Sequence, residues 1–145
     1  TFDEETRAFI KERMVQISEG IAGSFRAKAQ VSFGTGCPTL KNDPELSASA
    51  EEYVRELLGP GKAFSVSQLN AMGDGQKSSK SAGSEECAYV SQECPSVMLA
   101  LAAGQPEKGY LYPQHHPMVQ FDEDALSGGC AVFAYCAMRW LEEHK

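Results

Sequence analysis

The chain has 145 residues, enough for one domain or for one domain plus part of another, and its 42% hydrophobic and 23% charged residues are typical of a soluble globular protein. The net charge of −7 and the scattering of the 13 basic residues argue against a nucleic-acid partner, because a phosphate-binding surface needs clustered Lys and Arg. No membrane partner is expected either, since no stretch approaches the roughly 18 apolar residues of a membrane span and the N-terminus has no signal-peptide pattern.

The five cysteines are odd in number and show no C-x-x-C spacing. Free cysteines of intracellular proteins are usually reduced and buried. We therefore expect mostly buried thiols, a cytoplasmic location and no cysteine-based zinc site. The five are Cys37, Cys87, Cys94, Cys130 and Cys136.

A helix is predicted from the N-terminus to about Phe25. Asp3 can cap its first turn, which holds Glu4 and Glu5. Its apolar residues follow the spacing of an amphipathic helix. They are Ile10, Met14, Ile17 and Ile21. Residues 27–33 then alternate between apolar and polar, which predicts a half-buried strand of an antiparallel sheet.

A second helix has complete start and stop signals. It follows residues 34–41, whose glycines and proline predict a crossing between domains. Asp43 can cap the helix, Pro44 suits its first position, and Gly59 precedes a proline at its end. Its apolar stripe comprises Leu46, Ala50, Tyr53, Val54, Leu57 and Leu58.

A short strand at residues 63–66 and a long loop at residues 73–83 are predicted next. The loop contains Gly73 and Gly75, but a phosphate-binding role for them is weakly supported, because the P-loop spacing is absent.

A short third helix is expected to be capped by Ser84 and to stop before Pro95. Glu85 and Glu86 would lie in its first turn. Carboxylates there complement the helix dipole, but one of them could instead stand beside a metal site. The sequence leaves both interpretations open.

The continuous apolar run of residues 97–102 predicts a parallel strand that is buried on both faces. Gly104 follows it. Because ligands of open α/β sheets gather beyond the carboxyl ends of the strands, the loop after Gly104, which carries His115 and His116, is the predicted site.

The last helix is predicted to open at the acidic residues 122–124. Gly128 and Gly129 permit close approach of a neighbouring backbone. Its apolar stripe comprises Leu126, Cys130, Phe133, Ala137, Trp140 and Leu141. The order of elements predicts an α/β fold, in which a one-sided helix and strand precede a layered α/β unit.

His115 and His116 stand side by side between two prolines. Neutral imidazole is a common ligand for zinc and also suits manganese, cobalt and nickel. Adjacent side chains point in different directions, so we expect one ligand rather than two. The spacing equally allows histidines that are solvated or that support the turn. His144, near the C-terminus, is expected to be inert.

The residues alone complete no catalytic set. The chain contains no H-x-D, H-E-x-x-H or G-x-S-x-G motif. A catalytic zinc needs about three protein ligands and an open position, which one histidine cannot provide. The residues therefore predict a soluble α/β unit with a possible metal-binding loop.

Two segments resemble motifs of the M20 metallopeptidase and amidohydrolase family, which includes aminoacylase-like and hippurate-hydrolase-like enzymes. Residues 83–89, GSEECAY, are similar to its G-S-E-D-F-A-Y element. Residues 112–117, YPQHHP, and residues 121–126, FDEDAL, are similar to its Y-P-L-H-H-P and F-D-x-D-E-x-A-L elements. The similarity runs essentially from end to end.

The resemblance implies a two-domain enzyme, in which an α+β lid and dimerisation domain is inserted into an α/β catalytic domain with a two-metal centre. Residues 1–36 would be the second half of the lid, and residues 37–145 the C-terminal half of the catalytic domain. We expect the chain to begin inside a domain. The general base, a glutamate, and the other metal ligands would belong to an N-terminal half that the chain lacks.

By its place in the motif, His115 matches the last metal ligand of the family. His116, Glu85 and Gly104 are expected to contact substrate or to support the ligand, and no catalytic residue is expected in this segment. The expected cofactor is a divalent metal, zinc first, with manganese, cobalt or nickel as alternatives.

The resemblance implies hydrolysis of N-acyl amino acids or small peptides by a metal-activated water. We expect a homodimer, and we expect the 145-residue segment alone to be inactive. The alternative is a catalytically inactive fragment that acts as a binding or dimerisation module.

Overall fold

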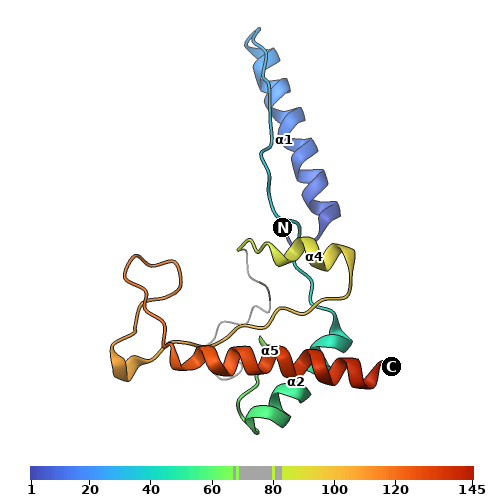
Figure 1. Ribbon diagram of the computed structural model, residues 1–145. Coiled ribbons are helices and arrows are strands. Elements are labelled where there is room, and N and C mark those ends of the chain that lie inside the picture. The colour runs from blue at the N-terminus through green and yellow to red at the C-terminus, as the bar shows by residue number, and fades with distance from the viewer. Residues whose placement is uncertain (67, 69–79, 81–82) are drawn as a thin grey trace.

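A computed structural model describes residues 1–66, 68, 80 and 83–145 of the chain (Figure 1). Within these residues the elements follow in the order α1 (Glu4–Ser24), α2 (Pro44–Leu58), α4 (Cys87–Glu93), the 3-10 helix η1 (Pro106–Lys108) and α5 (Asp124–Glu143). Their only strand-type pairing is an isolated antiparallel bridge between Gln105 and Tyr110. The described part of the chain is thus mostly helical, and the structure does not show the predicted layered α/β fold.

The first two predicted helices are confirmed, together with their caps. The Asp3 carboxylate accepts a hydrogen bond from the backbone N–H of Thr6 at 2.7 Å, and α1 ends at Ser24. The Asp43 carboxylate accepts in the same way from Leu46 at 2.8 Å. Each carboxylate satisfies a backbone donor that the first helical turn leaves free.

The start of α4 differs from the prediction. Ser84 does not cap this helix, which begins only at Cys87, with Glu86 in the cap position. The Glu85 carboxylate accepts a hydrogen bond from the backbone N–H of Cys87 at 3.2 Å. This carboxylate therefore satisfies a free donor at the helix start, and Ser84 stays outside the helix.

The three predicted strands do not form in this structure. Residues 27–33 run back beside α1 (Figure 1), with Ala29 and Val31 half-buried, but they are not assigned as a strand. Residues 63–65 are irregular, and Val66 is helical. Residues 97–102 are also irregular. A strand needs a ladder of hydrogen bonds to a neighbouring strand, and no such ladder joins the described segments.

The loop predicted over residues 73–83 falls mostly on residues that the structure does not describe. Gly73 and Gly75, and with them the weak phosphate-binding interpretation, lie outside the described residues.

The small core lies around α2 and at α4. Ala50 and Tyr53 on α2 are 3% and 2% exposed, and Ala88 on α4 is fully buried. Helix α5 packs on α2. The Tyr53 hydroxyl donates a hydrogen bond to the Glu143 carboxylate, and the Arg139 guanidinium lies 5.2 Å from the centre of the Tyr53 ring.

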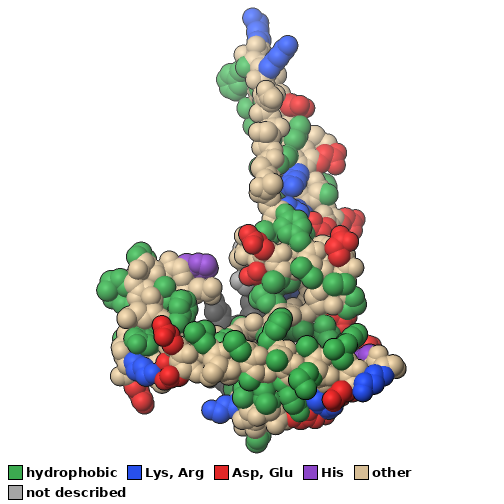
Figure 2. Space-filling model, in the orientation of Figure 1, with side chains coloured by type: hydrophobic (Ala, Val, Ile, Leu, Met, Phe, Trp, Pro, Cys, Tyr) green, Lys and Arg blue, Asp and Glu red, His purple; other side chains and the backbone are tan. Residues whose placement is uncertain are grey.

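The face of α5 that packs on α2 is not the face that the sequence suggests. The half-buried residues of α5 are Ala125, Gly128, Gly129, Val132, Tyr135, Cys136 and Arg139. The predicted apolar stripe is exposed instead, as Phe133 at 80% and Leu141 at 61% illustrate. Apolar side chains accordingly lie open along α5 in Figure 2. The stripe predicted the helix correctly, but within the described residues no element covers it.

Helix α1 projects from the rest of the molecule as an arm (Figure 1). Its apolar stripe is also exposed, from 41% at Ile10 to 59% at Ile21. None of the described helices has both the length and the hydropathy that crossing a membrane requires.

The arm joins the body at Gly36, next to the predicted domain boundary. The Gly36 carbonyl accepts hydrogen bonds from Arg7 Nη2 at 3.1 Å and from the Tyr89 hydroxyl at 2.7 Å. The Glu4 carboxylate accepts from the backbone N–H of Thr39 at 2.7 Å. These contacts tie α1 to α4, and the division into domains at residues 36 and 37 remains a prediction.

The five cysteines are free, as the sequence predicts. Their predicted burial is wrong, because Cys87, Cys94 and Cys130 are exposed, while Cys37 and Cys136 are half-buried. Cys87 and Cys130 lie on α4 and α5, and Cys94 follows the last residue of α4.

Candidate functional site

The two adjacent histidines lie in a loop between η1 and α5, drawn in orange at the left of Figure 1. The backbone N–H of His116 donates to the Pro113 carbonyl at 3.1 Å, and that of Val119 donates to the His116 carbonyl at 3.0 Å. Two consecutive turns therefore build the loop, and His116 belongs to both of them.

His115 lies at the third position of the first turn, with a backbone φ of 71° and an exposed side chain. A positive φ at this position is typical of a type II turn, which favours glycine or asparagine there. Placing a side chain in the left-handed region costs roughly 1–2 kcal/mol. The turn tolerates this strain and presents the imidazole of His115 to solvent.

His116 is half-buried, and two contacts hold its side chain. Its Nδ1 accepts a hydrogen bond from the backbone N–H of Met118 at 3.1 Å. Its ring stacks on Tyr112, with ring centroids 4.2 Å apart and planes inclined by 11°. Because Nδ1 accepts, the neutral ring carries its proton on Nε2. His116 therefore supports the turn, which is one of the roles that the sequence leaves open.

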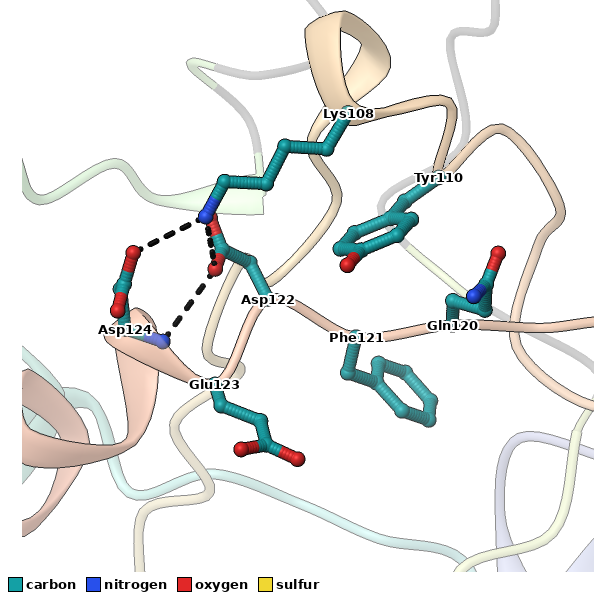
Figure 3. Close-up of a pocket in the computed structure, with 7 residues that line it drawn as sticks. All are labelled: Lys108, Tyr110, Gln120, Phe121, Asp122, Glu123 and Asp124. Atoms are coloured by element: carbon teal, nitrogen blue, oxygen red, sulfur yellow. Dashed lines mark hydrogen bonds and ion pairs between the residues drawn. The ribbon is translucent and has the colours of Figure 1, made fainter.

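An ion-pair cluster closes the base of this loop (Figure 3). The Lys108 ammonium lies 2.8 Å from Asp122 Oδ1 and 3.0 Å from Asp124 Oδ2. Hydrogen bonds to these carboxylates raise the pKa of Lys108, and the bond from Lys108 lowers the pKa of Asp122. The cluster joins η1 to the start of α5.

The same cluster forms one wall of an open pocket of about 450 Å³. The Tyr110 and Phe121 rings and the Gln120 amide line the other side, as Figure 3 shows. The pocket thus combines aromatic surface with an amide and a paired ammonium group. It lies where the histidine loop leaves η1 and enters α5.

Gly104 lies at the foot of the loop, one residue after Ala103, whose carbonyl accepts a hydrogen bond from the Asp122 backbone at 2.8 Å. Glu85 lies elsewhere, just before α4, which is separate from the histidine loop in Figure 1. The structure therefore brings Gly104, but not Glu85, to the base of the loop that holds both histidines. The roles of both residues remain predictions.

The donor set in the described residues fits one metal ligand rather than a whole centre. No three His, Cys, Asp or Glu side chains come together in the described part of the chain in a way that could hold an ion. The exposed His115 imidazole can contribute one nitrogen ligand. His144 stacks on Trp140 at 4.4 Å, at the far end of α5.

The Lys108 cluster is the feature that the sequence did not predict. The acidic run at residues 122–124 was interpreted as a helix start, which α5 confirms. Lys108 lies 14 residues before Asp122, and no periodic pattern links the two. The chain bends at Gly109, where φ is 81°, and returns to Ala103, whose carbonyl accepts the hydrogen bond from the Asp122 backbone.

Comparisons with known proteins find that the chain is similar to several hydrolases at low identity. It is 27% identical over 138 residues to a probable hydrolase of Synechocystis, covering 95% of this chain. It is 26% identical over 145 residues to the N-acetylcysteine deacetylase of Bacillus subtilis, covering 100% of this chain. It is 26% identical over 141 residues to thermostable carboxypeptidase 1 of Saccharolobus solfataricus, covering 97% of this chain.

The chain spans about a third of the length of these relatives, with 32%, 33% and 32% of each covered in turn. No family model matches the chain. No solved structure matches it either. The chain is therefore a distant relative of hydrolases, some of which are named for deacetylation or for cleavage of peptides.

Proposed function

We propose that the chain is the C-terminal portion of an M20-type metallo-amidohydrolase that hydrolyses N-acyl amino acids or small peptides. The similarity to a deacetylase and to a carboxypeptidase supports a hydrolase of amide bonds. The observation that carries the proposal is the strained, exposed position of His115. Strained backbone of this kind is often retained where a side chain must be presented for function.

In this proposal His115 is one ligand of a divalent metal, zinc first, in a two-metal centre. Such a metal, when bound, lowers the pKa of a water molecule and polarises the substrate carbonyl. His116 holds the turn through Met118 and Tyr112, which fixes the backbone from which the neighbouring imidazole projects. A ligand on a backbone that is already fixed loses less conformational entropy on binding.

Gly104 and Glu85 have different proposed roles. Gly104 leaves space at the foot of the loop, since no atom lies within 4 Å of the position where a Cβ would stand. Glu85 would reach the site only if α4 and the histidine loop moved closer to each other. The general base and the remaining metal ligands are assigned to the part of the relatives that this chain does not span.

The test compares the 145-residue chain with a polypeptide extended to the start codon of its open reading frame. Release of amino acid from N-acetyl and N-benzoyl substrates is measured with zinc, manganese or cobalt. The chain alone should be inactive, and the extended protein should turn over substrate. His115→Ala should abolish turnover and weaken metal binding by more than the roughly 10–100-fold that loss of an outer-shell partner costs.

His144→Ala is the matched control, because this histidine stacks on Trp140 at the other end of α5. It should leave turnover and metal content unchanged. A folded, metal-loaded extended protein without activity on any of these substrates would contradict the proposal. So would full activity of the His115→Ala variant.

A second candidate function is a non-catalytic binding or dimerisation module. The exposed stripe of α1 favours it, because Ile10, Met14 and Ile21 lie on a projecting helix that no described element covers. Under this proposal residues 1–36 form a homodimer interface. Light scattering separates the cases: a Met14→Glu variant should then become monomeric, and an unchanged mass would exclude this interface.

A further inference from the structure

The loop that carries the two histidines, residues 104–121, has one polar side-chain connection to the rest of the described chain. Its backbone hydrogen bonds stay inside the loop. Among the described residues, the Lys108 ammonium makes the only hydrogen bonds and ion pairs that leave the loop, and they end on the Asp122 and Asp124 carboxylates. One lysine therefore ties the histidine loop to the start of α5.

Apolar packing adds little to this connection within the described part of the chain. Leu111, Met118 and Phe121 are 70%, 59% and 55% exposed. The loop also stands apart from α2 and α4 in Figure 1. Because apolar side chains stabilise a contact roughly in proportion to the area that they bury, these three side chains do not fix the orientation of the loop.

Asp122 is the residue on which the base of the loop converges. Its backbone N–H donates to the Ala103 carbonyl at 2.8 Å. Its carboxylate accepts from Lys108 at 2.8 Å and from the Asp124 backbone N–H at 3.3 Å, as Figure 3 shows. Its side chain is 15% exposed, against 88% for Asp124. Since solvent and salt screen a shielded ion pair less than an exposed one, the contact between Lys108 and Asp122 is the stronger of the two.

His115 lies midway in the sequence between Lys108 and Asp122. The contacts of His116 hold the turn inside the loop, but they do not hold the loop against α5. A rotation at the base of a loop displaces its middle the most. The ion pair at the base therefore has its largest effect at the imidazole of His115.

We infer that Lys108 is a positioning residue for the proposed metal ligand His115. By holding η1 against the start of α5, Lys108 keeps the loop in the orientation from which this imidazole reaches a metal ion. Lys108 touches neither the ion nor the substrate in this role and acts through Asp122. The inference rests on the proposed function, and it adds a residue that none of the sequence motifs indicates.

The test measures two quantities in the extended polypeptide. The first is zinc affinity by titration calorimetry, and the second is amide hydrogen exchange of Asp122 in the metal-free protein. Lys108→Met keeps a long side chain but loses the ammonium group. It should weaken zinc binding about tenfold, the lower end of the range for lost outer-shell partners. It should also speed exchange of the Asp122 amide, because the base of the loop opens.

Lys108→Arg is the rescue variant. A guanidinium keeps the positive charge and offers five N–H donors, so it can bind both carboxylates. This variant should retain most of the zinc affinity and the slow exchange of the Asp122 amide. Glu107→Gln changes the charge of the neighbouring residue in η1, which forms no ion pair among the described residues, and should alter neither quantity.

Glu56→Gln is the control for a loss of stability alone. It weakens the ion pair between Glu56 and Arg139, which joins α2 to α5 away from the histidine loop. This variant should lower the thermal midpoint and leave zinc affinity unchanged. A merely structural role of Lys108 would give both variants the same pattern, so the two differ only if Lys108 positions the loop.

The outcomes separate this inference from the proposed function. If the unmodified extended protein binds zinc and Lys108→Met binds it equally well, the inference is overturned and the proposed function stands. Weaker zinc binding with unchanged exchange at Asp122 would also overturn it, because Lys108 would then act through its charge alone. An extended protein that binds no zinc would overturn the proposed function and this inference together.

Discussion

The imidazole of His116 stacks on the phenol ring of Tyr112, with ring centroids 4.2 Å apart and planes inclined by 11°. Together with the hydrogen bond from Met118 to Nδ1, this contact holds His116 in the turn. Among the described residues, no such contact restrains the adjacent His115, which carries the left-handed backbone. The two histidines therefore have different roles. His116 supports the loop, and His115 is presented to solvent.

Glycine at position 115 should stabilise the chain while removing the proposed ligand. The φ of 71° favours glycine, so His115→Gly should raise the free energy of unfolding by up to about 1 kcal/mol. Urea unfolding measures this change. His116→Gly, at a residue without a positive φ, is the control and should be destabilising. A loss of stability in His115→Gly would show that its imidazole makes a stabilising contact.

The two glycines of α5 should respond differently to alanine. Gly128 has no atom within 4 Å of the position of an added Cβ, so Gly128→Ala should stabilise the helix by about 0.5–1 kcal/mol. At Gly129 the added Cβ would meet Leu101 Cδ2 at 2.8 Å, so Leu101 must shift. Gly129→Ala should therefore raise the free energy of unfolding by less than Gly128→Ala, or lower it. Equal increases for the two variants in urea unfolding would contradict the close packing of α5 on residues 97–102.

The Lys108 cluster should make the base of the histidine loop sensitive to acid. The ion pair lowers the pKa of Asp122 below its ordinary value of 3.8. Its stabilising contribution is therefore complete above that value and is lost as the pH falls through the lower pKa of the folded state. Thermal unfolding between pH 6 and about pH 2 should show this loss.

Asp122→Asn should flatten that pH dependence, because the amide cannot titrate, although it can still accept the hydrogen bond from Asp124. Glu123→Gln changes the neighbouring carboxylate, which makes no ion pair with Lys108 in Figure 3, and serves as the control. At the alkaline end, the raised pKa of Lys108 keeps the ion pair intact above pH 10.5. If the Asp122→Asn variant lost thermal stability at low pH as the unmodified chain does, the acid sensitivity would not come from Asp122.

Arg139 should be difficult to replace, even by lysine. Its guanidinium binds Glu56 at 3.0 Å and Glu143 at 3.0 Å, and it lies over the Tyr53 ring. Lysine cannot reproduce this planar, forked geometry. Arg139→Lys should therefore lower the thermal midpoint, whereas Arg26→Lys, at an exposed position just after α1, should not. Equal midpoints for both variants would show that the contacts between α2 and α5 do not depend on this guanidinium.

Local signals in the sequence predicted the helices well. Asp3 and Asp43 cap the helices that were expected to follow them. The short helix was misplaced at its start, because Glu85 rather than Ser84 meets the free backbone donor. These elements depend on hydrogen bonds between neighbouring residues, which the order of residues specifies directly.

Strands were not predictable in the same way. The apolar run at residues 97–102 has the composition of a buried strand, but a strand exists only when another segment pairs with it. The described residues contain no such segment. Part of the candidate site was also predictable and part was not. The histidine pair was visible in the sequence, but the left-handed φ of His115 and the stacking of His116 were not.

The sequence by itself determined where α1, α2 and α5 form and which loop carries the two histidines. Only the tertiary structure decided that Lys108 meets Asp122, that α5 packs on α2 through Tyr135 and Arg139, and that the stripe containing Phe133 stays exposed. Helix formation rests on contacts three or four residues apart, but the choice of the buried face depends on which other surfaces are present to cover it.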